Sequence, residues 1–318
     1  MSKLSNQEMA GKKHPILTVL IILGVIGLLL GVSIIIVLTI SEPSSSLSFK
    51  DKIGIIPIDG TISVSRTVTT QLVRFKKDKN IKAIILRINS PGGLVGPTQE
   101  IYREVRKTIK TKKVIASMGS VAASGGYYIA AGANRIVANP GTITGSIGVI
   151  MEFFQIQDLL NKIGIKPEVL KSGEFKDTGS PHRKMTKREK ELINALINDI
   201  QKQFVEGVAN GRNLSVEKVQ QIADGRIFSG SQAKELGLVD ILGNFQDAVE
   251  LAKKMVNIKG DVSLVYPKRT KMGLLDLFLD SVTSSITKLL QDIKPRVEYR
   301  WRGFLAPSTC GLSENQGG

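Results

Sequence analysis

The chain has 318 residues, with 44 Lys and Arg against 28 Asp and Glu, and a formal net charge of +16. Its single cysteine, Cys310, excludes a disulfide within the chain, so stability must come from packing and assembly. The basic residues are scattered and no nucleic-acid-binding motif accompanies them, so we expect no nucleic-acid partner. Attraction to anionic membrane lipid, or simply a solvated basic surface, explains the charge.

The N-terminal region predicts a membrane anchor. Residues 16–40 carry no charge, and about 20 such residues span a bilayer as a helix. The run is too long for the core of a cleavable signal peptide, and no clear cleavage pattern follows it. Because Lys12 and Lys13 precede it, residues 1–15 are expected in the cytoplasm and the rest of the chain across the membrane. Residues 41–50 then link the anchor to a soluble domain.

Residues 51–266 are long enough for one α/β domain. Several short apolar runs, most of them rich in β-branched residues, predict strands, and helical patterns lie between most of them. This alternation predicts right-handed βαβ units and a largely parallel sheet. The predicted strands are Ile53–Ile58, Ile81–Asn89, Val114–Ser117, Arg135–Ala138 and Gly148–Glu152.

The second predicted strand ends abruptly in Ser90-Pro91-Gly92-Gly93. Two glycines let the backbone turn with positive φ and let another chain approach closely. A glycine N–H presented at this turn could pair with the N–H of Gly125 to hold an oxyanion. An ordinary turn into a helix near residues 96–110 accounts for the same residues.

A second turn follows the third predicted strand, in a run crowded with small residues, Ser120–Tyr128. Ser124 lies there at a strand-to-helix junction, where backbone N–H groups point outward and stabilise developing negative charge. The alternative is a helix start that packs closely against a neighbour and has no chemistry.

The remaining chain predicts two more helices and a change of composition. Residues 185–211 predict a long helix, with Thr186 and Glu189 as a capping box and Gly211 at its end. We expect its apolar stripe to serve core or subunit packing. Residues 231–240 predict a short helix closed by glycine. Residues 267–318 contain an amphipathic helical pattern followed by a small, polar, flexible tail.

These motifs closely resemble, in order and in spacing, those of the bacterial signal peptide peptidase A family. The resemblance runs from about residue 52 to residue 266 and fits the short form of the family, which has one copy of the domain. It implies a Clp-protease/crotonase-like α/β fold of repeated β-β-α/β-α-β units, with an N-terminal transmembrane helix. The segments that carry it are Asn89–Gly93, Ser117–Tyr128, Thr144–Val149, Lys171–Asp177 and Asp224–Arg226.

The resemblance also implies a set of catalytic residues and no metal or cofactor. Ser124 is the nucleophile, Lys176 the general base, and Ser146 a hydroxyl that orients the lysine. The backbone N–H groups of Gly93 and Gly125 form the oxyanion hole.

The base carries a chemical requirement. A lysine has an ordinary pKa of about 10.4, so Lys176 must be desolvated, and lie about 3 Å from the serine oxygen, before it can accept a proton. Pairing with its neighbours Glu174 or Asp177 would keep it charged and weaken it. A Ser–His–Asp triad would instead depend on His182, in a polar loop, because His14 flanks the predicted anchor.

The function that the resemblance implies is a serine endopeptidase of the bacterial inner membrane, with its catalytic domain on the extracytoplasmic side. It would degrade cleaved signal peptides and other apolar peptides with small side chains. The short forms assemble as ring-like homo-oligomers, expected to be octamers, in which the serine and lysine of one site can come from adjacent subunits. A crotonase-like acyl-CoA enzyme and a catalytically inactive membrane scaffold are the alternatives.

Overall fold

The computed structural model describes residues 22–33, 51–267 and 297–300. The chain divides into two units, residues 1–49 and 50–318, which are described separately. In the first unit, residues 22–33 are helical and their apolar side chains are largely exposed. No helix in the described ranges is long and apolar enough to cross a membrane. The ends of the predicted anchor, the linker at 41–50, and the amphipathic pattern and tail beyond residue 267, apart from residues 297–300, lie outside the described residues.

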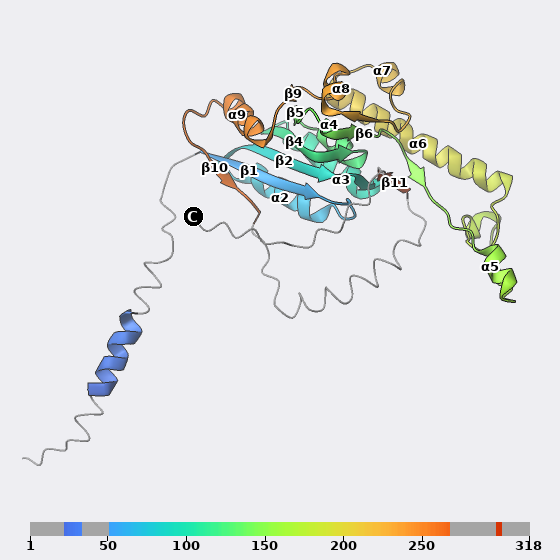
Figure 1. Ribbon diagram of the computed structural model, residues 1–318, viewed down its shortest axis with the longest axis horizontal. Helices are drawn as coiled ribbons and strands as arrows, with labels where there is room; N and C mark the ends of the chain where they lie inside the picture. Colours follow the sequence, from blue (N-terminus) through green and yellow to red (C-terminus); the bar gives the residue numbers. More distant parts are fainter. Residues whose placement is uncertain (1–21, 34–50, 268–296, 301–318) are drawn as a thin grey trace, which may run out of the picture. The chain divides into compact units, whose positions relative to one another are not determined.

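The second unit is built on a largely parallel sheet with strand order β10-β1-β2-β4-β5-β9 (Figure 1). A short strand, β6, pairs in parallel with the end of β4, and β8 pairs antiparallel with β6. The predicted α/β class with a mainly parallel sheet is therefore confirmed. The strands are β1 (Lys52–Asp59), β2 (Ile81–Ser90), β4 (Lys113–Ala123), β5 (Arg135–Ala138), β6 (Ile143–Gly145), β8 (Ile227–Ser229), β9 (Ile241–Leu242) and β10 (Ser263–Val265).

Helices cover both faces of this sheet, which explains the nearly continuous apolar runs of its strands. Ile53 and Ile55 of β1 pack on one face with the helix α9, whereas Ile56 and Ile58 pack on the other face with the remaining helices. Buried residues of the second face come from α2 (Arg66–Lys77), α3 (Val95–Thr108), α4 (Gly125–Ala131) and α6 (Lys187–Arg212), and those of the first from α9 (Phe245–Met255).

The long predicted helix is α6, and its capping box is present: the Thr186 side chain accepts from the N–H of Glu189, and the Glu189 side chain accepts from the N–H of Thr186. Its predicted end at Gly211 is wrong. Asn213 ends the helix with a φ of 54° in the left-handed region. Gly211 lies inside the helix, where a Cβ would come within 2.8 Å of the carbonyl carbon of Ala131. Gly211 therefore lets α6 pack closely against the backbone of Ala131 and does not end the helix.

The short predicted helix is α8 (Gly230–Glu235), followed by Gly237 at a φ of 80°, as the glycine-closed pattern predicted. A further short helix, α7 (Val216–Gln220), lies between α6 and β8.

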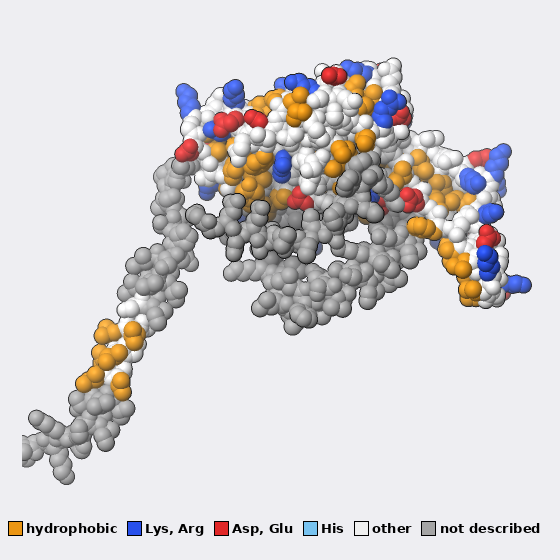
Figure 2. All heavy atoms as spheres, viewed as in Figure 1, with side chains coloured by type: hydrophobic (Ala, Val, Ile, Leu, Met, Phe, Trp, Pro, Cys, Tyr) orange, Lys and Arg blue, Asp and Glu red, His pale blue; other side chains and the backbone are white. Residues whose placement is uncertain are grey.

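Residues 152–196, which we call the arm, project beyond the sheet (Figure 1). The arm holds α5 (Gln157–Lys162), the 3-10 helix η1 (Glu174–Asp177) and the first part of α6. Its apolar side chains are exposed, as Figure 2 shows. These are Phe154, Ile156, Leu159, Ile163, Ile165, Val169, Leu170, Phe175, Leu192 and Leu196, each at least 38% exposed.

A separate antiparallel sheet of three short strands has the order β3-β11-β7. β11 (Val297–Arg300) is its central strand, between β3 (Gly92–Leu94) and β7 (Ile150–Met151). The strand predicted over 148–152 is therefore shorter than expected, and neither β3 nor β11 was predicted.

Candidate active site

Ser124 lies at the sharp turn between β4 and α4, as its sequence context predicted. Its backbone adopts φ 52° and ψ −117°, a conformation that is rare for a residue with a side chain. The turn is held by two hydrogen bonds of 2.8 Å: the Ser124 N–H donates to the carbonyl of Gly145, and its carbonyl accepts from the N–H of Tyr128. The residue is 1% exposed, and its hydroxyl has no hydrogen-bond partner among the residues that the structure describes.

The glycine turn after β2 lies beside Ser124, because β2 and β4 are adjacent parallel strands whose carboxyl ends meet at one edge of the sheet. Gly92 has a φ of +101°, and a Cβ there would lie 2.7 Å from the backbone nitrogen of Gly125. A Cβ on Gly125 would lie 3.3 Å from the Cα of Gly92. The structure therefore brings the two predicted turns together, with Gly92, the residue before Gly93, against Gly125 in one narrow cradle.

Ser90 holds this turn in place, a role that the sequence analysis did not assign. The residue is fully buried; its hydroxyl accepts from the N–H of Gly92 at 3.1 Å and donates to the carbonyl of Gly60 at 2.6 Å. Its position directly before Pro91-Gly92-Gly93 in the sequence could have indicated this role.

Ser146 follows β6, whose Gly145 pairs with Ala123 next to the nucleophile. It also has a positive φ, of 50°, and its N–H donates to the carbonyl of Arg226 at 2.8 Å. It is 7% exposed. The two serines are thus held at adjacent strand ends by the same kind of backbone constraint.

Lys176 lies elsewhere, on η1 of the arm, and it is exposed. Neither neighbouring carboxylate pairs with it: Glu174 binds Arg188 at 2.6 Å, and Asp177 binds Lys171 at 2.7 Å. Among the described residues, the side chain of Lys176 makes no hydrogen bond or ion pair. Within the described ranges, Lys176 is therefore not hydrogen-bonded to the Ser124 hydroxyl.

Arg183 holds the segment that carries Lys176. Its guanidinium donates to both carboxylate oxygens of Asp177, at 2.8 and 2.9 Å, and it also binds Glu189 in the capping box of α6. These hydrogen bonds from Arg183 lower the pKa of Asp177 and lower that of Glu189 to about 2. His182, next to Arg183, is half-buried on the same arm and makes no hydrogen bond to Ser124.

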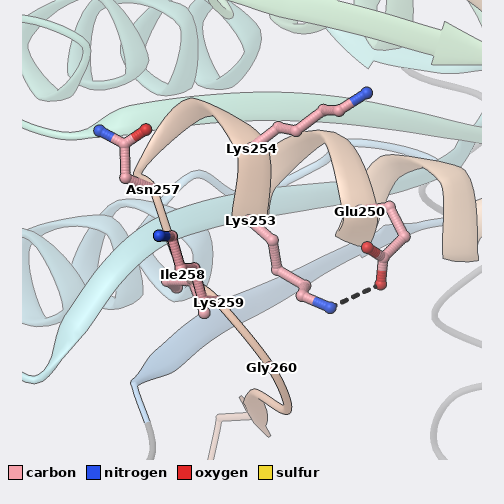
Figure 3. Close-up of a pocket in the computed structure, with 7 residues that line it drawn as sticks. All are labelled: Glu250, Lys253, Lys254, Asn257, Ile258, Lys259 and Gly260. Atoms are coloured by element: carbon pink, nitrogen blue, oxygen red, sulfur yellow. Dashed lines mark hydrogen bonds and ion pairs between the residues drawn. The ribbon is translucent and has the colours of Figure 1, made fainter.

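A hollow at the C-terminal end of α9 contains none of the predicted site residues (Figure 3). It is lined by Lys253, Lys254 and Lys259, and Lys253 is already paired with Glu250 at 2.9 Å. Within the described ranges, no group of three His, Cys, Asp or Glu side chains could hold a metal ion. The candidate site is therefore the cradle at Ser124.

Comparisons with known proteins identify the family of the chain. The profile of peptidase family S49 matches residues 106–259, which include Ser124, Ser146 and Lys176. The profile of Clp protease matches residues 46–142, and the parallel α/β arrangement is consistent with a Clp-protease-like fold.

Individual relatives match longer parts of the chain than either profile does. A Synechocystis protein named as a candidate protease is 46% identical over 215 residues, 67% of this chain and 78% of the relative. An Enterococcus faecium protein named as a candidate signal peptide peptidase is 39% identical over 211 residues, 66% of this chain and 61% of the relative. The chloroplastic serine protease SPPA of Arabidopsis thaliana is 35% identical over 261 residues, and the chain spans 38% of its length. The chain therefore belongs to the signal peptide peptidase A family, peptidase family S49.

Proposed function

We propose that this protein is a membrane-anchored serine endopeptidase with a Ser124–Lys176 dyad, which degrades signal-peptide remnants and other apolar peptides. The observation that supports it best is the buried, unpartnered hydroxyl of Ser124, held on a strained turn beside the glycine cradle. Such a turn is the usual way to present a nucleophilic serine next to backbone N–H groups that can bind an oxyanion.

In this mechanism the hydroxyl oxygen of Ser124 attacks the substrate carbonyl carbon while its proton passes to Lys176. The backbone N–H groups of Gly93 and Gly125 stabilise the oxyanion, and Ser146 orients the lysine. The lysine returns the proton to the leaving amine, which departs as the acyl-enzyme forms. Water then hydrolyses the ester and regenerates Ser124.

The lysine of each site comes from an adjacent copy in a homo-oligomeric ring, expected to be an octamer. Two observations support this arrangement: Lys176 is exposed and unpaired, and the arm that carries it exposes ten large apolar side chains. Burial of the arm against a neighbour would remove this apolar surface from water and would desolvate the ammonium of Lys176.

The uncharged residues 16–40 anchor the domain on the extracytoplasmic side of the bacterial inner membrane. The lysines that precede this run support the orientation, and the excess of basic residues favours contact with anionic lipid. A peptidase in this position meets the apolar peptides that remain in the membrane after signal-peptide removal.

Mixing two inactive variants tests whether Ser124 and Lys176 form a dyad and whether the two residues of one site come from different copies of the chain. Purified Ser124→Ala and Lys176→Ala each lose about a thousandfold in cleavage of an apolar signal peptide in detergent, because members of one catalytic unit each cost nearly the whole effect. Co-assembly of equal amounts restores about a quarter of wild-type activity, since in a ring with heterologous interfaces one in four sites receives both functional residues.

The matched control is Lys184→Ala, an exposed lysine of the same arm, which should keep full activity. Restoration would be absent if one chain supplied both residues. A correctly assembled wild type that cleaves no peptide would overturn the proposed function itself.

A further inference from the structure

The loop that carries Ser146 is held along one side by residues 223–226. The antiparallel pairing of β6 with β8 continues beyond both strands through two backbone hydrogen bonds. The Ser146 N–H donates to the carbonyl of Arg226 at 2.8 Å, and the Gly225 N–H donates to the carbonyl of Ile147 at 3.1 Å. A serine keeps a φ of 50° only where the surrounding structure imposes it. Residues 223–226 therefore set the backbone of Ser146.

The turn Asp224–Arg226 is closed by its own side chains. The carboxylate of Asp224 accepts from the backbone N–H of Arg226 at 3.1 Å, and from Nε of its guanidinium at 2.8 and 2.9 Å. The side-chain hydrogen bonds from Arg226 lower the pKa of Asp224 to about 2, so the pair stays charged at neutral pH. The two side chains are 51% and 58% exposed, and an exposed ion pair adds little to global stability. The pair therefore fixes the turn locally.

Gln201 of α6 holds the same loop from its other side. Its amide nitrogen donates to the carbonyl of Ala223 at 2.8 Å and lies 3.5 Å from the carbonyl of Ile147, the residue after Ser146. One side chain thus bridges the start of the turn and the segment that carries Ser146. The side-chain oxygen of Gln201 is buried and has no hydrogen-bond partner among the described residues. An unpaired buried oxygen is unfavourable, so glutamine is explained here by the donors that it supplies to the loop.

The loop also lies against the nucleophile. The carbonyl of Gly145, the residue before Ser146, accepts from the N–H of Ser124 at 2.8 Å. A Cβ on Gly148 would lie 3.2 Å from the Cα of Gly225, so the loop and the turn pack closely. Within the described part of the chain, no hydrogen bond holds the hydroxyl of Ser146, and its position follows from this backbone.

We propose that the turn Asp224–Arg226, together with Gln201, positions the hydroxyl of Ser146 against the lysine of the dyad. Asp224 and Gln201 are then positioning residues of the peptidase reaction. This rests on the proposed function, in which Ser146 orients Lys176. A displacement of about 1 Å in a catalytic group can lower a rate about a hundredfold. Because the turn does not bind substrate, its loss acts on kcat rather than on KM. The alternative is a surface turn that only connects α7 to β8.

The first test is a double-mutant cycle between Asp224 and Ser146, in the full chain in detergent with an apolar signal peptide as substrate. Asp224→Ala alone should lower kcat by about tenfold or more and leave KM within about twofold. Thermal unfolding and oligomeric state should stay those of the wild type, because the ion pair is exposed. In a Ser146→Ala background the same substitution should lower kcat less than about twofold further, since residues that act as one unit are not additive.

Asp224→Asn should recover part of the lost kcat, because an amide oxygen can still accept from the N–H of Arg226. The matched control is Glu217→Ala, an exposed acidic residue on α7, which should keep the kcat of the wild type. Losses that add in the double variant would show that the turn does not act through Ser146 and would overturn the inference. If Asp224→Ala cleaves the peptide as fast as an active wild type, the inference is wrong and the proposed function stands. A correctly assembled wild type that cleaves no peptide ends both.

The second test removes the bridge from α6. Gln201→Leu keeps the apolar volume of the side chain and loses both donors, so kcat should fall by about tenfold or more and KM should change little. In a Ser146→Ala background it should have no further effect beyond about twofold. Gln203→Leu, at an exposed glutamine of the same helix, is the control and should keep wild-type kinetics. A folded Gln201→Leu variant with wild-type kcat would overturn the role assigned to Gln201.

Discussion

The backbone of Ser124 occupies a region that costs a non-glycine residue roughly 1–3 kcal/mol. This conformation is kept because two backbone hydrogen bonds fix the turn. The Ser124 N–H donates to the carbonyl of Gly145, and the Tyr128 N–H donates to the carbonyl of Ser124. Ser146 carries the same feature one strand away, with its N–H on Arg226. Two serines with positive φ at adjacent strand ends fit the proposed function, in which both hydroxyls serve one site.

Gly92 gives a prediction at this scale. Gly92→Ala should lower kcat/KM by about a hundredfold or more, comparable to the loss of an oxyanion donor. Its φ of +101° disfavours any Cβ, and the added methyl would strike the backbone of Gly125 and the carbonyl oxygen of Tyr299. Peptide cleavage and thermal unfolding are measured together.

Gly96→Ala is the matched control for that substitution. Gly96 lies four residues away in α3, where a Cβ meets no atom within 4 Å. Alanine there should leave activity unchanged and stabilise the helix by about 0.5–1 kcal/mol. Equal activity of both variants would contradict the role assigned to the glycine cradle.

At the scale of elements, the ion network of Arg183 joins η1 to the start of α6 and so fixes the segment that carries Lys176. The lowered pKa values of Asp177 and Glu189 mean that their contribution to stability is present above their ordinary pKa values. The contribution of Glu189 is lost as the pH falls from about 4.5 through 2, and that of Asp177 is lost as the pH falls below its ordinary pKa of 3.8. We expect the melting temperature of wild type to fall across this window.

Arg183→Ala removes the partner of both carboxylates, so its melting temperature should depend less on pH between 5 and 2. Peptide cleavage should fall at least tenfold through kcat, because Lys176 loses its support, and Arg183→Lys should recover only part of it, since an ammonium cannot bridge both carboxylates as a guanidinium does. Lys184→Ala serves as the control. A pH dependence identical to that of wild type would show that the network does not set these pKa values.

The elements show what could be predicted from the sequence and why. β1, β2 and β5 were predicted closely because they are apolar runs buried on both faces, and α6 because its capping box is local. β3, β7 and β11 are two to four residues long and pair only through a partner far along the chain, which no local periodicity reports.

The candidate site also has parts that could be predicted from the sequence and parts that could not. Ser124, Gly93 and Gly125 follow from turns at the ends of adjacent strands, and the structure brings those turns together. The aromatic cluster of Tyr102, Tyr128, Phe204 and Tyr299 was not predicted because its residues come from three helices and a short strand that are far apart in the sequence.

At the scale of the whole molecule, the arm is the feature that supports the proposed assembly. Leu170 is 92% exposed, and Leu159 is 57% exposed. Exposed apolar surface of this extent, gathered on one projecting segment, marks an interaction site. The first part of α6 continues it, with Leu192 and Leu196 exposed where later turns of the same helix are buried in the core.

Assembly through the arm gives the prediction for the molecule as a whole. Leu170→Asp and Leu159→Asp should convert the proposed oligomer to smaller species in detergent and lower peptide cleavage at least tenfold, because each would place a charge in the proposed interface between copies. Val216→Asp, at an exposed apolar position on α7, should change neither. Light scattering coupled to size-exclusion chromatography gives the mass of each species. A monomeric variant that retains full activity would show that one chain holds the complete site, and Lys176 would then have to reach Ser124 by a movement of its own arm.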